Sequence, residues 1–595
     1  MILQRLVDYY DRVDGLPGFG WIRRRIDYVF VLEPDGQCIA VESLEQGEGK
    51  SKTTPELLVP AIGKQALKHT MSGKDANLLW DNSKFVLGLG KGGGGKLNCF
   101  RGTLTQWLGE LADPGVSAVA TFCADMAQRE GAVDELLARF DLVEDFGKRD
   151  PCVAFRLASD IEPVFARPAV RAAYAEKLAE ATRGEALLGN CLVTGREKVP
   201  ITKNETVIKG VWGAQTSGAN VVSFNARSFE SYGKRQRGGE NAPIGQEASF
   251  AYTTALNHLL RKDSEQRVQV GDSSTVFWAE RPHELETAFA KLFGEPPSDD
   301  PQAGARAVAE VYRAVDSGKF GVGDVETRFH VLGLAPNAAR ISIRFWETAP
   351  ALELARRVRQ HFEDLRIARG PKDPEHRSLT RLLRACALLG KTDNLPPSLG
   401  GEVIRAVLSD LPYPATLLQA AVQRCRAEQH VGYARAAVIK AWLCREYRRA
   451  GESKKPNDRE PQPMLDPHNP NPAYRLGRLF AALEKIQEES SPGINATIRD
   501  RFYGAASGTP GTVFPTLLRL KNHHLGKLGK GRAIQMERLV ADIMDGLTDF
   551  PPHMLMPDQG RFAIGYYHQR QALFTKRTEN SDGNTNGTDA TETDQ

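Results

Sequence analysis

The pattern of apolar residues changes near residue 347, and this change excludes a fold built on one repeating plan. Before it, short strand-like runs are mixed irregularly with helical patterns, whereas after Pro350 nearly every apolar residue follows the helical period. Such an irregular mixture favours an α+β fold over a doubly wound sheet. We therefore predict an α+β domain over residues 1–346 and a helical domain over 347–450.

Several short segments carry the strand pattern. The clearest is "DYVFVLEPDGQCIAVESL" (27–44), in which a Pro-Asp-Gly turn joins two strand-like runs. Further strands are predicted at 84–89, 152–157, 220–225, 274–279, 328–334 and 339–346. Helices are predicted between them at 132–140, 169–182, 247–262 and 283–293.

A second boundary falls at "GESKKPNDREPQPMLDPHNPNP" (451–472), which is rich in proline and charge and poor in apolar residues. Such a composition is typical of a linker. Helical patterns resume after it and predict a compact helical bundle over 473–577. The last residues, 578–595, are acidic and contain hardly any apolar side chains, which predicts a disordered tail.

Composition narrows the class of protein. Of the 595 residues, 41% are hydrophobic and 26% charged, and no apolar run is long enough to cross a bilayer. The first residues, "MILQRLVDYYDRV", do not read as a signal peptide, and the eight cysteines contain no C-x-x-C pair. No H-E-x-x-H or G-x-S-x-G motif is present. We expect a cytoplasmic protein with reduced thiols, no metal site and no cofactor.

The segment "FVLGLGKGGGGKLNCF" (85–100) is spelled like a phosphate-binding loop. Residues 90–96 fit G-x-x-x-x-G-K, but Leu97 stands where a Ser or Thr hydroxyl would bind magnesium. The following "LNCFRG" also begins a helix poorly, although the phosphates need helix amides there. We therefore predict a mobile surface loop in which Lys91 and Lys96 contact a phosphate backbone, and an ATP-driven component is a minor alternative.

The segment "KGVWGAQTSGANVVSFNARSFESYGKRQRGG" (209–239) does not resemble core. Glycine lets a backbone approach a ligand closely, and Gln and Asn side chains present a donor and an acceptor together, as base-edge recognition requires. Its basic residues suit phosphates, and its aromatic residues could pack or stack. The residues concerned are Lys209, Lys234, Arg235 and Arg237 for phosphates and Trp212, Phe224, Phe229 and Tyr232 as aromatics. A polar loop that binds nothing is the alternative.

The same segment carries a resemblance to a known family. "KGVWGAQTSGANVVSFNARSFESYG", followed by "NAPIGQEASFAYTTALNHLL", closely resembles the large subunit of the type I-C CRISPR Cascade complex, a Csd-type Cas protein. The likeness extends to "MILQRLVDYYDRV", "LLWDNSKFVLG", "VLGLAPNAARISIRFW" and "AYRLGRLFAALEKIQ", so it covers nearly the whole chain.

The resemblance implies a non-catalytic subunit of an RNA-guided surveillance complex. Such a subunit recognises the protospacer-adjacent motif in duplex DNA, promotes unwinding and R-loop formation, and presents the target to a helicase-nuclease. The implied partners are target DNA, the 5′ handle of the guide RNA and the other Cascade subunits: backbone, handle-binding and small. By analogy, we place motif reading and wedging on Gln215, assisted by Ser217, Asn220 and Asn225, with Asn82 and Lys84 as second candidates.

The resemblance also gives the proline-rich segment a meaning. In this family an internal translation start is understood to yield a separate small subunit, and Met464 lies just before the C-terminal helices. Residues 464–577 contain fifteen Lys and Arg against ten Asp and Glu, which suits a surface that binds a nucleic-acid strand. An enzyme remains the alternative: a nuclease or a guide-RNA processing endoribonuclease with His258 or His283 as general base.

Overall fold

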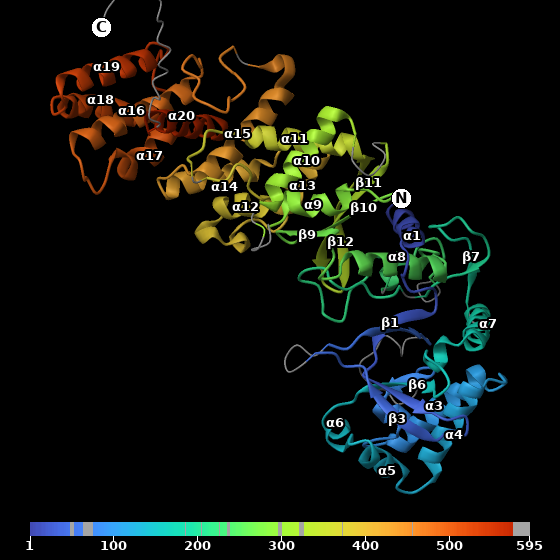
Figure 1. The fold of residues 1–595 in the computed structure, drawn as a ribbon. Helices are drawn as coiled ribbons and strands as arrows, with labels where there is room; N and C mark the ends of the chain where they lie inside the picture. The colour runs from blue at the N-terminus through green and yellow to red at the C-terminus, as the bar shows by residue number, and fades with distance from the viewer. Residues whose placement is uncertain are drawn as a thin grey trace, which may run out of the picture. The chain divides into compact units, whose positions relative to one another are not determined.

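The computed structural model describes residues 1–47, 53–62, 75–184, 186–203, 205–224, 226–234, 239–295, 300, 302–319, 326–371, 373–454 and 456–574. The chain forms two compact units, each containing helices and small sheets (Figure 1). The first unit is Met1–Ile208 with Val222–His258, and the second is Lys209–Val221 with Leu259–Gln595. The predicted α+β class is confirmed. The domain boundaries drawn from the sequence stay predictions, and the predicted disordered tail lies outside the described residues.

A four-stranded sheet of order β3-β2-β6-β5 forms the centre of the first unit. Its strands are β2 (Tyr28–Leu32), β3 (Cys38–Ser43), β5 (Trp80–Asn82) and β6 (Cys152–Leu157). The predicted hairpin is confirmed as β2 and β3, whose turn contains Gly36 at φ +88°. α3 (Gly93–Leu108) and α4 (Pro114–Gln128) pack on this sheet through aromatic contacts such as Phe30 with Phe122 (Figure 1).

The remaining elements of the first unit surround this sheet. They are α1 (Ile2–Arg12), β1 (Trp21–Arg25), β4 (Glu56–Pro60), α2 (Ser83–Val86), α5 (Ala132–Arg139), α6 (Val143–Lys148), α7 (Pro168–Gly184), β7 (Leu188–Gly189), β8 (Val199–Pro200) and α8 (Gln246–Leu259). The helices predicted at 132–140, 169–182 and 247–262 are confirmed.

Two predicted strands are wrong. Residues 84–89 begin within helix α2, because the Asn82 side chain accepts the Lys84 N–H at 3.2 Å and so caps a helix turn. Residues 220–225 make only one isolated parallel bridge, between Asn220 and Arg340, and residue 225 lies outside the described residues. In both places a local apolar run has the pattern of a strand, but among the described residues it forms no continuous pairing with a neighbouring strand.

An antiparallel sheet of order β12-β11-β10-β9 begins the second unit. It contains β9 (Arg267–Val270), β10 (Ser273–Ala279), β11 (Arg328–Asn337) and β12 (Arg340–Pro350), which confirms three predicted strands. Phe277 and Phe329 lie on the face covered by helices, where Phe277 meets Phe289 of α9 (Leu285–Phe293) at 4.6 Å between ring centroids. Ser274 and Trp278 alternate with them and lie on the opposite face.

Most of the rest of the second unit consists of helices. They are α10 (Ala303–Ser317), α11 (Ala351–Leu365), α12 (Leu379–Cys386), α13 (Leu399–Leu408), α14 (Ala415–Ala427), α15 (Tyr433–Ala450), α16 (Pro472–Ser490), α17 (Ile498–Gly508), α18 (Pro510–Leu525), α19 (Lys530–Met544) and α20 (Met556–Phe574). One continuous apolar core runs from the sheet to α20. None of the described helices is both long and apolar enough to span a membrane.

The proline-rich segment contains no strand or α-helix over residues 456–471, yet it is held at several points. The Ala368 N–H donates to the Pro463 carbonyl at 2.7 Å, and Asp458 lies 3.3 Å from Arg561 of α20. The segment therefore contacts residues that precede it and residues that follow it in the chain.

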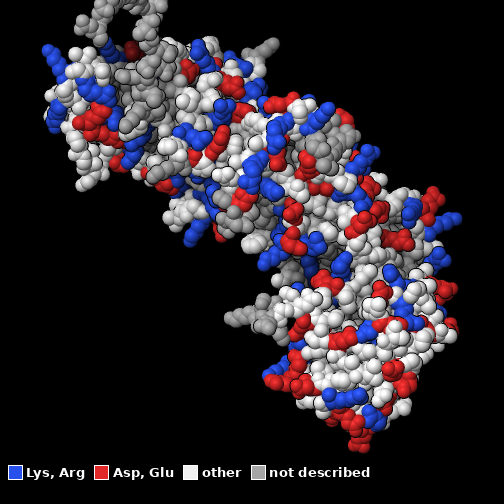
Figure 2. Space-filling view, viewed as in Figure 1, with Lys and Arg blue, Asp and Glu red and all other residues white. Residues whose placement is uncertain are grey.

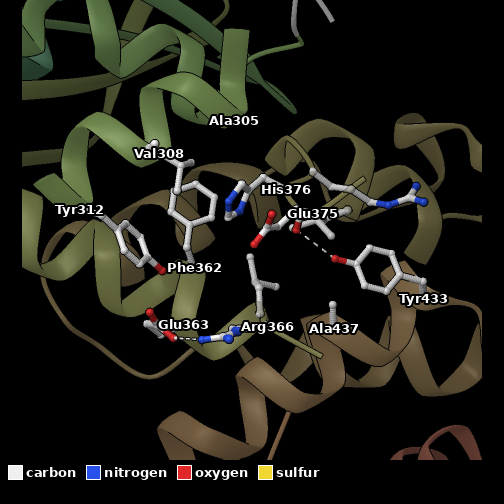
Figure 3. Close-up of a pocket in the computed structure, with 14 residues that line it drawn as sticks. Ala305, Val308, Tyr312, Phe362, Glu363, Arg366, Glu375, His376, Tyr433 and Ala437 are labelled. Carbon is white, nitrogen blue, oxygen red and sulfur yellow. Dashed lines mark hydrogen bonds and ion pairs between the residues drawn. The ribbon is translucent and has the colours of Figure 1, made fainter. Parts of the chain in front are cut away.

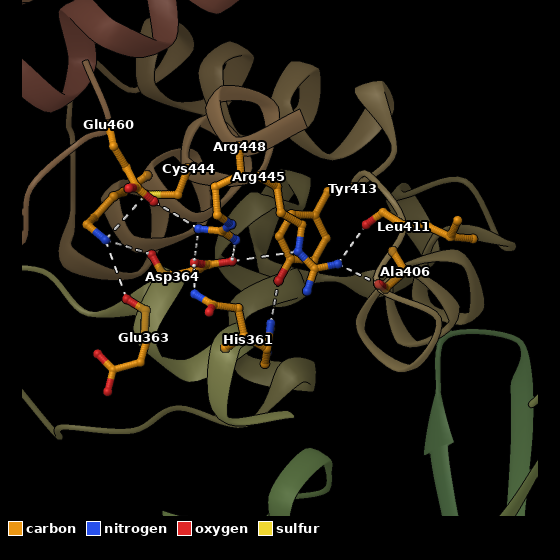
Figure 4. A network of polar contacts seen from close by, with 12 residues as sticks. His361, Glu363, Asp364, Ala406, Leu411, Tyr413, Cys444, Arg445, Arg448 and Glu460 are labelled. Atoms are coloured by element: carbon orange, nitrogen blue, oxygen red, sulfur yellow. Dashed lines mark hydrogen bonds and ion pairs between the residues drawn. The ribbon is translucent and has the colours of Figure 1, made fainter. Parts of the chain in front are cut away.

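A buried cluster of charges joins α11, α15 and this segment (Figure 4). Asp364, only 2% exposed, accepts from Arg448 through both carboxylate oxygens at 2.8 and 2.6 Å. The buried Arg445 lies 3.6 Å from the same carboxylate and 4.3 Å from the ring centroid of Tyr413. Arg448 also reaches Glu460 of the proline-rich segment at 2.9 Å. A carboxylate buried with such partners is held in one geometry.

Two buried histidines predict a loss of stability in mild acid. Burial and the nearby Arg445 lower the pKa of His361 to about 3, and burial and Lys440 lower the pKa of His568 to about 3. The unfolded chain, with histidine pKa near 6.5, binds these protons first as the pH falls. The unfolding free energy should therefore fall from about pH 6.5 toward pH 3, by about 1.4 kcal/mol per pH unit for each histidine.

Denaturant unfolding at pH 7.0, 6.0 and 5.0 would measure this slope before most carboxylates titrate. A His361→Asn variant should show a shallower pH dependence than the natural chain. Equal slopes in the two proteins would contradict the assignment to His361.

Candidate nucleic-acid interface

The loop 209–221 is anchored at both ends on the sheet of the second unit. The Trp212 N–H donates to Ser274 Oγ at 2.9 Å, and the Asn220 carbonyl accepts the Ile341 N–H at 2.8 Å. Val211 and Ala219, each next to one of these anchors, are buried. Residues 212–217 between them are exposed except for the half-buried Ala214, and the exposed residues include Trp212, Gln215 and Ser217.

Glycine fixes the shape of this loop. Gly210 has φ +92°, and a Cβ there would lie 2.6 Å from the Leu260 carbonyl oxygen. Gly218, at φ +100°, donates its N–H to the Gln215 carbonyl at 2.9 Å and closes a tight turn. Gln215 therefore occupies the first position of a turn and its side chain is exposed. Asn220, in contrast, is half-buried, and its backbone is engaged with the sheet.

Residues 222–234 belong to the first unit. The Val222 N–H donates to Glu205 Oε2 at 3.1 Å, and the same carboxylate accepts the Tyr252 hydroxyl. The segment ends in a tight turn, in which the Lys234 N–H donates to the Ser231 carbonyl at 3.0 Å. The phosphate candidates Lys209 and Lys234 are both exposed. The candidates Asn225, Arg235 and Arg237 lie outside the described residues.

The second pair of reading candidates, Asn82 and Lys84, makes contacts within the protein. Asn82 is 7% exposed, caps α2 and donates its amide to Asp81 at 3.2 Å. Burial raises the pKa of Asp81 to about 6. Lys84 forms an ion pair with Asp150. These contacts leave little of Asn82 for a nucleic acid, so we do not include it in the proposed interface.

The glycine string, predicted as part of a mobile surface loop, instead leads into a helix. Helix α3 begins at Gly93, although "LNCFRG" had suggested that no helix starts there. A Cβ at Gly93 would lie 1.7 Å from the Gly88 carbonyl oxygen, so close packing of the chain on itself explains this glycine. The residues before it form helix α2 and not the strand that a phosphate-binding loop follows, and Leu97 is buried in the core. Lys91 is exposed and Lys96 is half-buried.

Basic side chains also gather at the turn between α18 and α19. Lys527 and Lys530 are exposed there, Arg519 is exposed on α18 and Arg538 on α19, and none of the four has an ion pair within the part of the chain that the structure describes. Two further cations are paired, Lys521 with Glu537 and Arg532 with Glu489. Elsewhere charges of both signs are interspersed on the face that Figure 2 displays. With a formal net charge of only +4, attraction to a polyanion has to come from such local groups.

A pocket of about 430 Å³ lies in the second unit among α10, α11, α12 and α15 (Figure 3). Its floor is apolar and includes Val308, Phe362 and Ala437. Arg366 at its rim already pairs with Glu363 at 3.7 Å. None of the predicted reading residues lines this pocket.

The two histidines proposed as general bases belong to different units. His283 is buried and its Nδ1 accepts the Leu285 N–H at 3.1 Å at the start of α9, whereas His258 lies beside Tyr9 in the first unit. Among the described residues no three His, Cys, Asp or Glu side chains are grouped so that they could hold a metal ion.

Comparison with known proteins adds one match. A family model described as CRISPR-associated protein (Cas_Csd1) matches residues 6–574, which is nearly the whole chain. No curated protein matches it.

Proposed function

Because the chain belongs to the Cas_Csd1 family of CRISPR-associated proteins, we propose that it is the non-catalytic large subunit of a type I-C Cascade complex. In this role it reads the protospacer-adjacent motif in duplex DNA, promotes R-loop formation and presents the target to a helicase-nuclease. It also contacts the 5′ handle of the guide RNA and the other Cascade subunits.

One observation carries the proposal: the loop 209–221 is anchored by hydrogen bonds near both ends but exposes its polar middle. A reading loop has to hold its side chains in place before DNA arrives, because ordering it on binding would cost free energy. Hydrogen bonds to Ser274 and Ile341 provide that anchoring. The Gln215 amide offers a donor and an acceptor at the exposed turn, which is the equipment for a base edge or for a first opened pair.

The division of labour in an RNA-guided complex fits this small reading surface. Guide pairing reads the long target sequence, so the protein reads only a short duplex element and holds the strands by their backbones. Lys209 and Lys234 are exposed for the second task. Lys527 and Lys530, at the α18–α19 turn, are suited to contact the phosphates of a nucleic-acid strand that runs along the C-terminal helices.

The C-terminal helices also bear on a shorter product that starts at Met464. Such a product would contain α16 to α20, since α16 begins at Pro472. In the full chain α20 packs on α14 and α15, where a Cβ at Gly560 would lie 3.3 and 3.2 Å from Leu418 and Ile439 side-chain atoms. A separate small subunit would lack α14 and α15. We propose that another subunit of the complex then covers the apolar face of α20.

A Gln215→Ala variant tests the reading role. Loss of the amide should weaken discrimination between motif and non-motif duplexes by about 1–3 kcal/mol, or roughly 5- to 150-fold in relative binding. The measurement is duplex binding and R-loop formation by the assembled complex over a library of flanking sequences. Gln128→Ala, at an exposed glutamine at the end of α4, is the matched control and should behave as the natural chain. An unchanged motif preference in Gln215→Ala would refute the assignment.

A further inference from the structure

Exposed aromatic side chains are concentrated in one short stretch of the chain. Among the described phenylalanine, tryptophan and tyrosine residues, the exposed ones are Trp212, Phe224, Phe229, Tyr232 and Phe574. Four of these five fall within residues 212–232. Apart from Phe574, the other aromatic side chains of the described chain are buried or half-buried, so this concentration is not a general property of the surface.

Tyr232 is the extreme member of this group. Its side chain is 98% exposed, so it contributes almost no buried surface to the fold. Its backbone adopts φ +53°, followed by Gly233 at φ +70°, between the hydrogen-bonded Ser231 and Lys234. Such a turn favours Asn or Asp before Gly, because a side chain branching into a ring is strained in the left-handed region. The tyrosine thus adds no buried surface to the fold and strains the left-handed turn. Since it does not stabilise the fold, we expect a role in binding.

The surroundings of Tyr232 indicate the chemistry of the ligand. Arg227 and Lys234 are exposed in the same segment, and the described residues 226–234 contain one acidic residue, Glu230. Exposed rings interleaved with cations are what single-stranded nucleic acids bind, because every base has a face to stack on and every nucleotide has a phosphate. A protein-binding aromatic would instead be expected among apolar neighbours that exclude water.

We propose that Tyr232 is a base-stacking residue that holds an unpaired nucleotide. The ligand is a single-stranded segment of DNA or RNA, whose base lies on the tyrosine ring while Lys234 contacts an adjacent phosphate. This inference rests on the proposed function, and it adds a contact to an unpaired base where that function requires only recognition of a duplex. In an R-loop, such a contact would stabilise a strand once it is displaced.

Replacement of Tyr232 by asparagine separates stacking from folding. Asparagine tolerates the left-handed backbone, so Tyr232→Asn should melt at the same temperature as the natural chain or slightly higher. Binding of a single-stranded oligonucleotide to the full-length protein should weaken by about 5- to 150-fold, the range that base–aromatic stacking spans. Because stacking releases no counterions, the slope of log K against log salt should stay the same. Tyr232→Trp should restore binding.

A probe and a matched control make the result specific. An oligonucleotide containing 2-aminopurine reports stacking through quenching of its fluorescence, which should be lost in Tyr232→Asn and kept in Tyr232→Trp. Lys234→Gln should show the opposite behaviour, with quenching kept and the salt slope reduced by about one.

Other outcomes would overturn the inference. Equal single-strand affinity and quenching in Tyr232→Asn would exclude stacking, while preserved motif discrimination on duplex DNA would leave the proposed function intact. Unchanged single-strand binding combined with weaker assembly of the complex would show that Tyr232 contacts a protein subunit. If the natural chain in its complex showed no motif discrimination at all, the proposed function itself would fail.

Discussion

An Asp364→Ala variant is expected to lose about 3–5 kcal/mol of unfolding free energy, because it leaves the buried Arg445 and the half-buried Arg448 without their carboxylate. Asp364 lies between Arg448 and the buried Arg445, and its backbone carbonyl accepts Lys440 Nζ at 3.0 Å. That carbonyl stays in the variant, but Arg445 is 3% exposed, so water cannot replace the carboxylate that it loses. A loss of this size is a large fraction of the stability of a typical domain.

Denaturant unfolding of the purified chain measures this loss. The control is Asp316→Ala, which removes a solvent-exposed partner of Arg359 and should cost less than about 1 kcal/mol. Asp364→Asn should fall between the two, because the amide oxygen still accepts hydrogen bonds but carries no charge. A cost for Asp364→Ala as small as that of Asp316→Ala would show that the buried cluster contributes little.

A Gly477→Ala variant is expected to separate two helices and destabilise the C-terminal part of the second unit by about 3 kcal/mol. A Cβ at Gly477 of α16 would lie 2.0 Å from the Phe562 carbonyl oxygen of α20, and one at Gly565 would lie 2.0 Å from the Tyr474 carbonyl oxygen. These neighbours are backbone atoms of the facing helix, so no side chain can rotate away to make room. The two helices touch through both glycines.

Thermal unfolding and limited proteolysis would report this separation. Gly504→Ala in α17 is the matched control, since the nearest atom to its added Cβ is the Arg426 carbonyl oxygen at 4.0 Å. Alanine favours a helix over glycine, so the control should gain up to about 1 kcal/mol. Two variants that melt alike would show that α16 and α20 can part without cost.

Much of the secondary structure follows from local patterns. The turn at residues 34–36, the strand at 328–334 and the helices after residue 472 are where alternation and helical spacing placed them. Local patterns succeed here because the spacing of side chains along a helix or strand is a property of neighbouring residues. The two failures, at 84–89 and 220–225, are apolar runs whose strand character depended on a pairing partner that the fold does not supply.

The candidate interface could be predicted only in part. Glycine, glutamine and asparagine in residues 209–225 indicated a loop suited to recognition, and the structure shows Gln215 exposed in an anchored turn. Sequence could not show that Asn82 is buried as a helix cap, since burial is decided by segments distant in the chain. It also left the aromatic residues open between packing and stacking. The structure shows that Tyr232 is 98% exposed, which excludes packing in the core and supports the stacking proposed for it.

The sequence by itself determined the α+β class, the family motifs, and the Leu97 substitution that argues against a nucleotide site. Only the tertiary structure decided why Gly93 and Gly477 are glycine, that Tyr232 stands in solvent on a left-handed backbone, and that helices on both sides of residues 451–472 share one core. The physical reason is the same in each case. Periodicity and chemistry are local, whereas steric room and exposure depend on atoms that folding brings from elsewhere in the chain.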